Sequence, residues 1–242
     1  MQPCYKRILL KLSGQALGGE YGQGLDASTL QNLCREVATV IDLDVQVAIV
    51  VGGGNFFRGA QASNLSMDRA NADYVGMLAT VMNAIALQQA FATSNVPACV
   101  QTAIPMSPVA EPYVRERALK YLDSRSVVIF GAGTGNPFFT TDTAASLRAI
   151  EIEADLLLKA TQVDGVYDRD PNTYADAKRY EKVSYDEVLH KRLNVMDATA
   201  IALCREHELP VCVFNISNPG CLHRIIMGDN REGTLVHSEV ES

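Results

Sequence analysis

Positively charged residues are scarce relative to negatively charged ones in this chain. Its 242 residues include 21 Lys and Arg against 28 Asp and Glu, which gives a net charge of −7. A protein that binds a nucleic-acid polymer needs a basic face to neutralise the phosphate backbone, so this class is disfavoured. A small phosphorylated ligand is compatible with the charge, because a few fixed donors in a cleft outweigh a modest net charge.

The chain also lacks long apolar runs and paired cysteines. The longest apolar stretches, such as Val45–Val51 with Gln46 inside it, are far shorter than the ~20 residues that span a bilayer. Near the N-terminus, Lys6, Arg7 and Lys11 leave no room for the apolar core of a signal peptide. The six cysteines include no Cys-x-x-Cys pair, which favours free thiols over a disulfide or metal site. These absences predict a cytoplasmic protein with no membrane partner.

Short apolar, β-branched runs alternate with helical stretches along the chain. The expected strands are Ile8–Leu12, Val45–Val51, Ala98–Gln101, Ser126–Phe130, Asp155–Ala160 and Val211–Asn215. The expected helices are Ser28–Ile41, Arg69–Ser94, Tyr113–Leu122, Asp142–Glu151 and Asp197–His207. Such alternation is typical of a parallel sheet covered by helices on both faces. We therefore expect an α/β fold, a three-layer α/β/α sandwich around a mainly parallel open sheet, as a single domain over residues 1–242.

Glycine-rich loops follow several of the expected strands. They are Gly14 after the first, Gly52-Gly53-Gly54-Asn55 after the second, and Gly131–Pro137 after the strand that ends at Phe130. In an open parallel sheet the carboxyl ends of the strands line the ligand crevice, and glycines let backbone amides approach phosphate oxygens. Neither G-x-x-x-x-G-K-[ST] nor G-x-G-x-x-G occurs, which disfavours a P-loop NTPase and a dinucleotide-binding fold. A tight strand-to-helix turn is the structural alternative for the three consecutive glycines.

Two lysines and one aspartate complete the candidate site. Lys11 and Lys159 each lie near the carboxyl end of an apolar strand, where an ammonium group is costly to bury without an anionic partner. Asp142 begins a helical stretch and could hold both ammonium groups; a plain helix cap and lysines that extend to solvent are the alternatives. The four histidines lie in the last quarter of the chain, so no Ser-His-Asp or Cys-His arrangement is supported. An anionic acceptor needs no base, so positioning and charge neutralisation would suffice for catalysis.

Four motifs together resemble the amino-acid-kinase superfamily and, within it, the bacterial uridylate kinases. The motifs are Lys11–Gly14 (KLSG), Val51–Gly59 (VGGGNFFRG), Thr134–Asp142 (TGNPFFTTD) and Lys159–Tyr167 (KATQVDGVY). The triple glycine with its asparagine and the last motif are signals of the superfamily, whereas NFFRG and GNPFFTTD are specific to the uridylate branch. The resemblance extends over essentially the whole chain. It implies phosphoryl transfer from ATP to UMP, giving ADP and UDP, in pyrimidine nucleotide biosynthesis.

The resemblance also implies a role for each matching residue. Catalysis is expected from Lys11, Asp142 and Lys159, with the lysines neutralising the transferring phosphoryl group and Asp142 orienting them. ATP binding is expected from Lys11, Leu12, Ser13, Gly14, Gly54, Arg58, Thr161, Tyr167 and Asp170. UMP binding is expected from Gly53, Asp73, Thr134, Gly135, Asn136, Pro137, Phe138, Phe139, Thr140 and Thr141, with Asp73 on the ribose hydroxyls. For Asp73, Tyr167 and Arg58 the structural alternatives are a solvated helix residue, a loop anchor and a surface charge.

The resemblance further implies that Mg²⁺ is carried with ATP, that UTP inhibits from the UMP pocket, and that dimers formed on the long helix assemble into a homohexamer. Some members carry charged residues for a GTP effector in the second half of that helix. Here residues 87–94 contain no arginine or histidine, so GTP stays an effector candidate only. Two alternative functions stay open. One is a sister kinase that phosphorylates a carboxylate or carbamate, such as an acetylglutamate, aspartate or carbamate kinase; the other is a uridine-nucleotide sensor without turnover.

Overall fold

The computed structural model describes residues 2–58 and 66–238. Gly59, the last residue of the second motif, lies outside these ranges.

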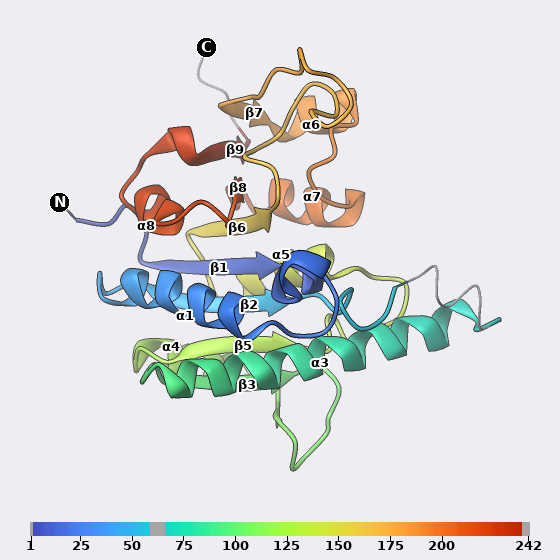
Figure 1. Cartoon of the computed structure of the whole chain (residues 1–242), viewed down its shortest axis with the longest axis vertical. Helices are drawn as coiled ribbons and strands as arrows, with labels where there is room; N and C mark the ends of the chain where they lie inside the picture. The colour runs from blue at the N-terminus through green and yellow to red at the C-terminus, as the bar shows by residue number, and fades with distance from the viewer. Residues whose placement is uncertain (1, 59–65, 239–242) are drawn as a thin grey trace.

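Nine strands form one sheet within the described part of the chain (Figure 1). Their order is β4-β3-β5-β2-β1-β6-β8-β9-β7. The strands are β1 (Arg7–Leu12), β2 (Gln46–Val51), β3 (Ala98–Thr102), β4 (Glu111–Pro112), β5 (Val127–Gly131), β6 (Leu156–Thr161), β7 (Lys182–Ser184), β8 (Val211–Asn215) and β9 (Gly233–His237). Neighbouring strands are parallel except β8 and β9, which are antiparallel. The expected mainly parallel open sheet is confirmed.

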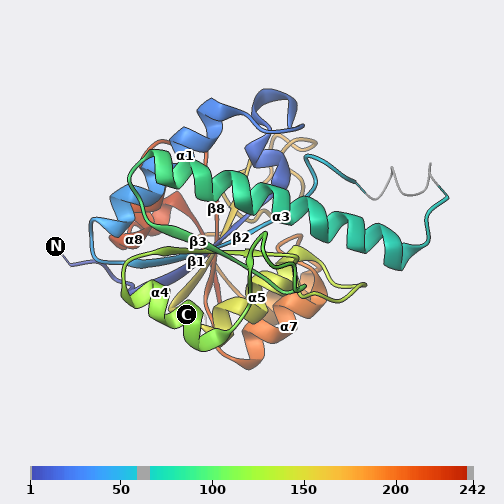
Figure 2. The same cartoon turned by 90° about the horizontal axis from the view of Figure 1, so that it is seen from below.

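Helices cover both faces of the sheet, as Figure 2 shows. One face carries α1 (Ala27–Ile41), α3 (Arg69–Thr93) and α8 (Cys221–Ile226). The other carries α4 (Arg115–Asp123), α5 (Thr141–Glu151), α6 (Tyr185–Lys191) and α7 (Ala198–Glu206). Short 3₁₀ helices are η1 (Gly14–Leu17), η2 (Gly19–Tyr21) and η3 (Asn230–Glu232). The three-layer α/β/α arrangement is therefore confirmed.

Side chains of the central strands alternate between two hydrophobic cores. Leu10 and Ile49 pack into the core under α1, α3 and α8, whereas Leu9 and Val50 pack into the core under α4 to α7. All four side chains are fully buried. Because successive side chains of a strand point to opposite faces, a strand covered on both faces needs an uninterrupted apolar run. This requirement explains why β1 and β2 are apolar along nearly their whole length.

The helix α3 has a high average hydropathy for a helix of a mainly parallel α/β protein. Its 25 residues include an 18-residue window of mean hydropathy 1.4, so by length and composition alone it could cross a membrane. The expectation concerned unbroken apolar runs, which this helix also lacks; the average is high because alanines and methionines stand among its polar residues. The helix packs on β3 and β5, and 44% of the window is buried there. A helix that covers a sheet passes the same test, so the test is weak evidence for a membrane span.

The carboxyl ends of the parallel strands meet at one edge of the sheet. At this edge β1 and β6 are in register with Lys11 opposite Lys159. On the other side of β1, strand β2 leads into the Gly52–Gly54 turn. The N-terminal part of α3 extends past this edge (Figure 2). The two candidate lysines and the glycine turn are thus brought together by strand order alone.

Several short elements were not predicted. The strands β4 and β7 have two and three residues, which is too short for an alternating pattern to be recognised. The strand β9 and the short helices α6 and α8 were also missed. The expected strands and helices are otherwise present, with ends that differ by about two residues or fewer, as is usual for boundaries set from sequence.

Candidate functional site

One aspartate lies between two lysines at the carboxyl edge of the sheet. Lys11 Nζ is 2.6 Å from Asp142 Oδ1, and Lys159 Nζ is 2.9 Å from Asp142 Oδ2. The three side chains are between 10% and 17% exposed. Lys159 Nζ also donates a hydrogen bond to the carbonyl oxygen of Val195. Asp142 therefore holds two ammonium groups side by side, as expected from the sequence.

The charges of Lys11, Asp142 and Lys159, called the lysine unit below, oppose the cost of burying these three side chains. Burial alone would raise the pKa of Asp142, but the neighbouring Lys11 and Lys159 charges outweigh it and hold the pKa below 3.8. For Lys159, burial is the larger influence and lowers the pKa below 10.5, although Asp142 acts in the opposite direction. The ion pairs thus keep the carboxylate ionised while one lysine is made easier to deprotonate. Two ammonium groups against one carboxylate leave a net positive charge that suits an anionic ligand.

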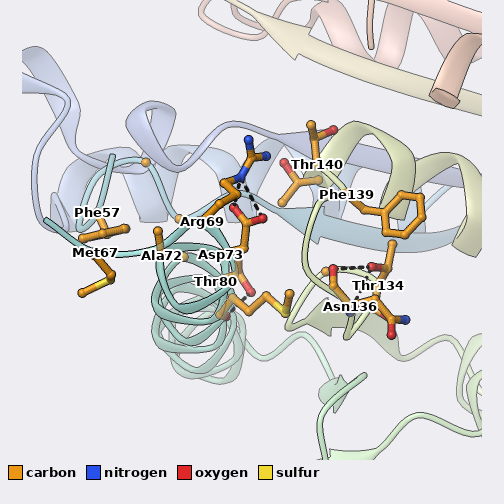
Figure 3. A pocket seen from close by; sticks show the side chains of 16 residues that line it. Phe57, Met67, Arg69, Ala72, Asp73, Thr80, Thr134, Asn136, Phe139 and Thr140 are labelled. Atoms are coloured by element: carbon orange, nitrogen blue, oxygen red, sulfur yellow. Dashed lines mark hydrogen bonds and ion pairs between the residues drawn. The ribbon is translucent and has the colours of Figure 1, made fainter. Parts of the chain in front are cut away.

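A cavity of about 570 Å³ opens beside this unit (Figure 3). Its wall is built from the glycine turn after β2, the N-terminal half of α3 and the loop between β5 and α5. Seven of the residues expected to bind UMP line it: Gly53, Asp73, Thr134, Asn136, Phe139, Thr140 and Thr141. Gly54, expected on the ATP side, lines the same cavity. Thr141, which lines the cavity, directly precedes Asp142 in the chain, so the wall of the cavity continues into the helix that carries this aspartate.

Asp73 lies in the wall of this cavity with its carboxylate already engaged. Arg69 Nε is 2.9 Å from both carboxylate oxygens, and the backbone N–H of Phe138 donates to Oδ2 at 2.7 Å. The side chain is 19% exposed. The alternative of a solvated helix residue is therefore wrong, because Asp73 ties α3 to the loop between β5 and α5.

The glycines of the loop after β1 and of the turn after β2 allow contacts that no side chain would tolerate. A Cβ atom on Gly53 would lie 2.7 Å from the carbonyl oxygen of Gly76 on α3. A Cβ atom on Gly14 would lie 2.7 Å from the backbone nitrogen of Gly54. Both distances are far inside van der Waals contact, so only glycine fits at these positions. The loop after β1, the turn after β2 and α3 are therefore packed backbone against backbone.

A second cleft, of about 400 Å³, is formed by the segment that follows β6 and by residues 191–194. Tyr167 and Asp170 line it, and so do Arg192, Leu193 and Asn194, which directly precede Val195. Tyr167 donates its hydroxyl hydrogen bond to Asp164 Oδ1 at 2.5 Å, and Asp170 accepts from the N–H of Asn172. Asp142 therefore follows a residue of the first cavity, Thr141. Lys159 donates to Val195, which follows a residue of the second cleft, Asn194.

Four further residues expected to bind ATP make contacts within the protein itself. Leu12 is buried in the core, and Ser13 caps η1 by accepting from the N–H of Ala16. Thr161, at the end of β6, donates to the carbonyl oxygen of Val163. Arg58 Nε donates to the carbonyl oxygen of Gly54, so its guanidinium lies over the glycine turn.

Three of the residues expected to bind UMP do not line the larger cavity, all of them in the loop between β5 and α5. Gly135 has φ +80°, and a Cβ there would press against Ala103. Phe138 has φ +72° and is 68% exposed. Pro137 lies between Asn136, which lines the cavity, and Phe138, which does not. The structure thus brings together most, but not all, of the residues expected to bind UMP.

Other residues of the site were missed by the sequence analysis. Arg69 and Thr80 line the larger cavity from α3, and nothing in the sequence distinguishes them from other helix residues. Asp197 accepts hydrogen bonds from the hydroxyls of Thr140 and Thr143 and caps α7. Its position before a helix marks it as a cap, but its contact with α5 depends on the tertiary fold.

Metal ligands are not clustered in the residues that the structure describes. No group of three or more His, Cys, Asp or Glu side chains is arranged there to hold a metal ion. Asp142, the carboxylate nearest to the lysines, is engaged by both of them. The donor set therefore does not fit a resident metal centre.

The chain is similar to known proteins over nearly its whole length. The family model of the amino acid kinase family matches residues 6–215. The chain is 42% identical to the UMP kinase from Bacillus anthracis, with a TM-score of 0.95 and coverage of 98% of this chain and 97% of that one. It is 37% identical to the UMP kinase from Ureaplasma parvum, with a TM-score of 0.91 and coverage of 98% and 100%.

A more distant similarity is to the uridylate kinase from Archaeoglobus fulgidus, at 27% identity and a TM-score of 0.71 over 95% of this chain and 99% of that one. The family model matches most of the chain, and a relative of 42% identity matches nearly all of it. This chain belongs to the amino acid kinase family.

Proposed function

We propose that the protein is a UMP kinase that transfers the γ-phosphoryl group of ATP to UMP, giving ADP and UDP for pyrimidine nucleotide biosynthesis. Two relatives that align over nearly the whole chain are UMP kinases. The observation that carries the proposal is the unit of Lys11, Asp142 and Lys159, with one cavity lined by Thr141, the neighbour of Asp142, and a second cleft lined by Asn194, the neighbour of Val195. Two substrates that meet at two ammonium groups are what a phosphoryl transfer between nucleotides requires.

The lysines provide charge where the reaction develops it. In phosphoryl transfer, negative charge spreads over the oxygens of the transferring group, and fixed cations stabilise it. Lys11 and Lys159 are held by Asp142 before substrate arrives, so little reorganisation is needed. The phosphate of UMP is already an anion near neutral pH and attacks without a general base. Catalysis is then positioning and charge neutralisation.

The larger cavity is assigned to UMP and the second cleft to the nucleoside of ATP. In the cavity, Asp73 binds the ribose hydroxyls and Thr134–Thr141 surround the uracil and phosphate, as the family resemblance implies. In the cleft, Tyr167 and Asp170 contact the adenosine, with Thr161 at the end of β6 close by in the chain. The loop Lys11–Gly14, with Gly54 and Arg58, contacts the phosphates of ATP. Magnesium enters as part of the MgATP substrate, because its ions bind readily to phosphate oxygens.

Assembly and regulation follow the same resemblance. Exposed apolar side chains at Tyr74, Leu78, Met82 and Ile85 lie on α3, which supports dimers formed on this helix and a homohexamer built from them. UTP carries the uracil and ribose of UMP and is proposed to inhibit from the same cavity; GTP is kept as an effector candidate. The six cysteines are free thiols, which supports a reducing cytoplasmic location. We treat residues 1–242 as one catalytic domain.

A coupled assay of ADP release tests the proposal against its alternatives. Purified protein with MgATP is offered UMP, CMP, glutamate or aspartate in separate reactions. We expect ADP release with UMP well above that with the other three acceptors. Release driven by an amino acid would identify an acyl-phosphate-forming sister kinase. Binding of UMP without ADP release from any acceptor would identify a nucleotide sensor.

A further inference from the structure

Two buried asparagines form a closed hydrogen-bonded pair beneath the glycine turn. Asn55 Nδ2 donates to Asn83 Oδ1 at 2.9 Å, and Asn83 Nδ2 donates to Asn55 Oδ1 at 2.8 Å. Their second amide hydrogens go to backbone carbonyls: Asn83 to Gly52 at 2.7 Å and Asn55 to Gly24 at 2.6 Å. Asn83 is fully buried and Asn55 nearly so. All four amide hydrogens of the pair therefore have partners.

The pair touches both loops that approach the lysine unit. A Cβ atom on Gly14 would lie 2.5 Å from Asn55 Oδ1, so the loop after β1 rests directly on this carboxamide. The backbone N–H of Gly24 also donates to the carbonyl oxygen of Asn55 at 3.1 Å. Asn55 thus fixes the segment between Gly14 and Gly24 from two points, and Asn83 anchors Asn55 to α3.

The same face of α3 holds the loop on the acceptor side. Thr80, one turn before Asn83, accepts the backbone N–H of Ala132 at 2.7 Å, and Asp73 accepts that of Phe138. Elsewhere the inner face of α3 is apolar, with Ala84, Leu87 and Phe91 in the core. A contact that served only packing could be apolar as well. The buried polar side chains of α3 in the described residues, Thr80 and Asn83, occur where α3 meets the loops of the site, and there they bind backbone groups.

We propose that Asn83 is a positioning residue for phosphoryl transfer, which acts by fixing the glycine turn after β2 and, through Asn55, the loop after β1. The inference rests on the proposed function. Asn83 lines neither of the two hollows described above and acts on the reaction only through the backbone that it holds. A displacement of about 1 Å in the groups that position a substrate can lower the rate by about 10²-fold. We therefore expect loss of the Asn83 anchor to lower kcat.

The test compares Asn83→Ala with the double variant Asn55→Leu/Asn83→Leu and with Asp186→Asn, an 81% exposed position on α6 away from the two loops. Thermal unfolding, kcat and KM for both nucleotides, and amide hydrogen exchange are measured well below each melting temperature. Asn83→Ala should lower kcat at least about tenfold and speed exchange in residues 14–24 and 52–57. The double variant removes both amides together but leaves the Gly24 and Gly52 carbonyl oxygens without these donors, so it should regain part of the melting temperature but not kcat. Asp186→Asn should match wild type in kcat and in hydrogen exchange of the two loops.

The outcomes separate positioning from stability. A folded Asn83→Ala with kcat within twofold of wild type would overturn the proposal. So would a double variant that recovers kcat together with its melting temperature, because the asparagines would then contribute only to stability. Failure of the proposed function is visible separately, since wild type itself would then form no UDP. In that event the hydrogen-exchange comparison still decides whether Asn83 fixes the two loops.

Discussion

Recognition of the ribose by Asp73 can be tested by removing one hydroxyl from the acceptor. The carboxylate lies in the cavity wall beside Arg69 (Figure 3), and it also accepts the backbone N–H of Phe138. A carboxylate has about four lone-pair positions, and Arg69 and Phe138 occupy three of them, so accepting both ribose hydroxyls requires one of the two Arg69 contacts to give way. With dUMP, the hydrogen bond from the 2′-hydroxyl is lost and the acceptor position is left unfilled.

The size of the effect follows from the charge and burial of this carboxylate. Its side chain is 19% exposed, so a hydrogen bond from the ribose is charge-assisted and largely shielded from water. Such a bond contributes about 1.5–3 kcal/mol. At about 1.4 kcal/mol for each factor of ten, dUMP should be a poorer acceptor than UMP by about one to two orders of magnitude in kcat/KM.

Steady-state kinetics with both acceptors provide the assay. Asp73→Ala should lower kcat/KM for UMP and narrow the gap to dUMP, because the discriminating group is absent. Asp73→Asn, which keeps the size but not the charge, should narrow the gap less. Asp186→Asn, an 81% exposed position on α6, serves as the control and should leave both acceptors unchanged. A preference for UMP that survives Asp73→Ala undiminished would refute the ribose-binding role.

Further predictions concern the lysine unit and the inhibitor. Lys159→Ala should lower kcat by about 10²–10³ with little change in the KM for UMP, because its charge acts mainly in the transition state; near-normal turnover would exclude it from catalysis. Burial lowers the pKa of the Lys159 ammonium group below its ordinary value of 10.5, so kcat should begin to fall with rising pH before pH 10.5 is reached. A kcat that stays constant up to pH 10.5 would contradict this. The pKa of Asp142 lies below 3.8 because the lysine charges outweigh burial, so its stabilising contribution is complete above pH 3.8 and is lost as the pH falls through the folded-state pKa. Urea titrations should therefore show the stability difference between wild type and Asp142→Asn shrinking at low pH, and a constant difference would contradict the ion pairs. UTP should compete with UMP in inhibition kinetics, and inhibition that excess UMP does not relieve would place UTP elsewhere.

Much of the fold was predictable because its strongest signals are local. Strands such as β1 and β2 are buried on both faces, so their apolar runs are continuous and easily recognised. The order of strands and helices then places Lys11 and Lys159 at the same edge. Elements such as β4 and β7 were not predictable, because a few residues carry no periodic pattern and form strands only where a neighbouring strand pairs with them.

The site was predictable only in part, for a different reason. Lys11, Asp142 and Lys159 stand out in sequence because charged residues beside apolar strands are costly to bury alone. Asn83 and Asp197 do not stand out, because a helix asparagine and a helix cap are ordinary features. Their importance arises from contacts with Asn55 and Thr140, residues distant in the chain, and such contacts are visible only in the folded structure.

The central claim is that Lys11, Asp142 and Lys159 bring about phosphoryl transfer from ATP to UMP. A rapid-quench single-turnover experiment with γ-labelled ATP, excess enzyme and UMP measures this step directly, by following the label into UDP. Wild type should transfer the label to UDP within one turnover, and Lys159→Ala should do so about 10²–10³ times more slowly while binding UMP with similar affinity. Label that appears only in inorganic phosphate, or transfer by Lys159→Ala at the wild-type rate, would contradict the account.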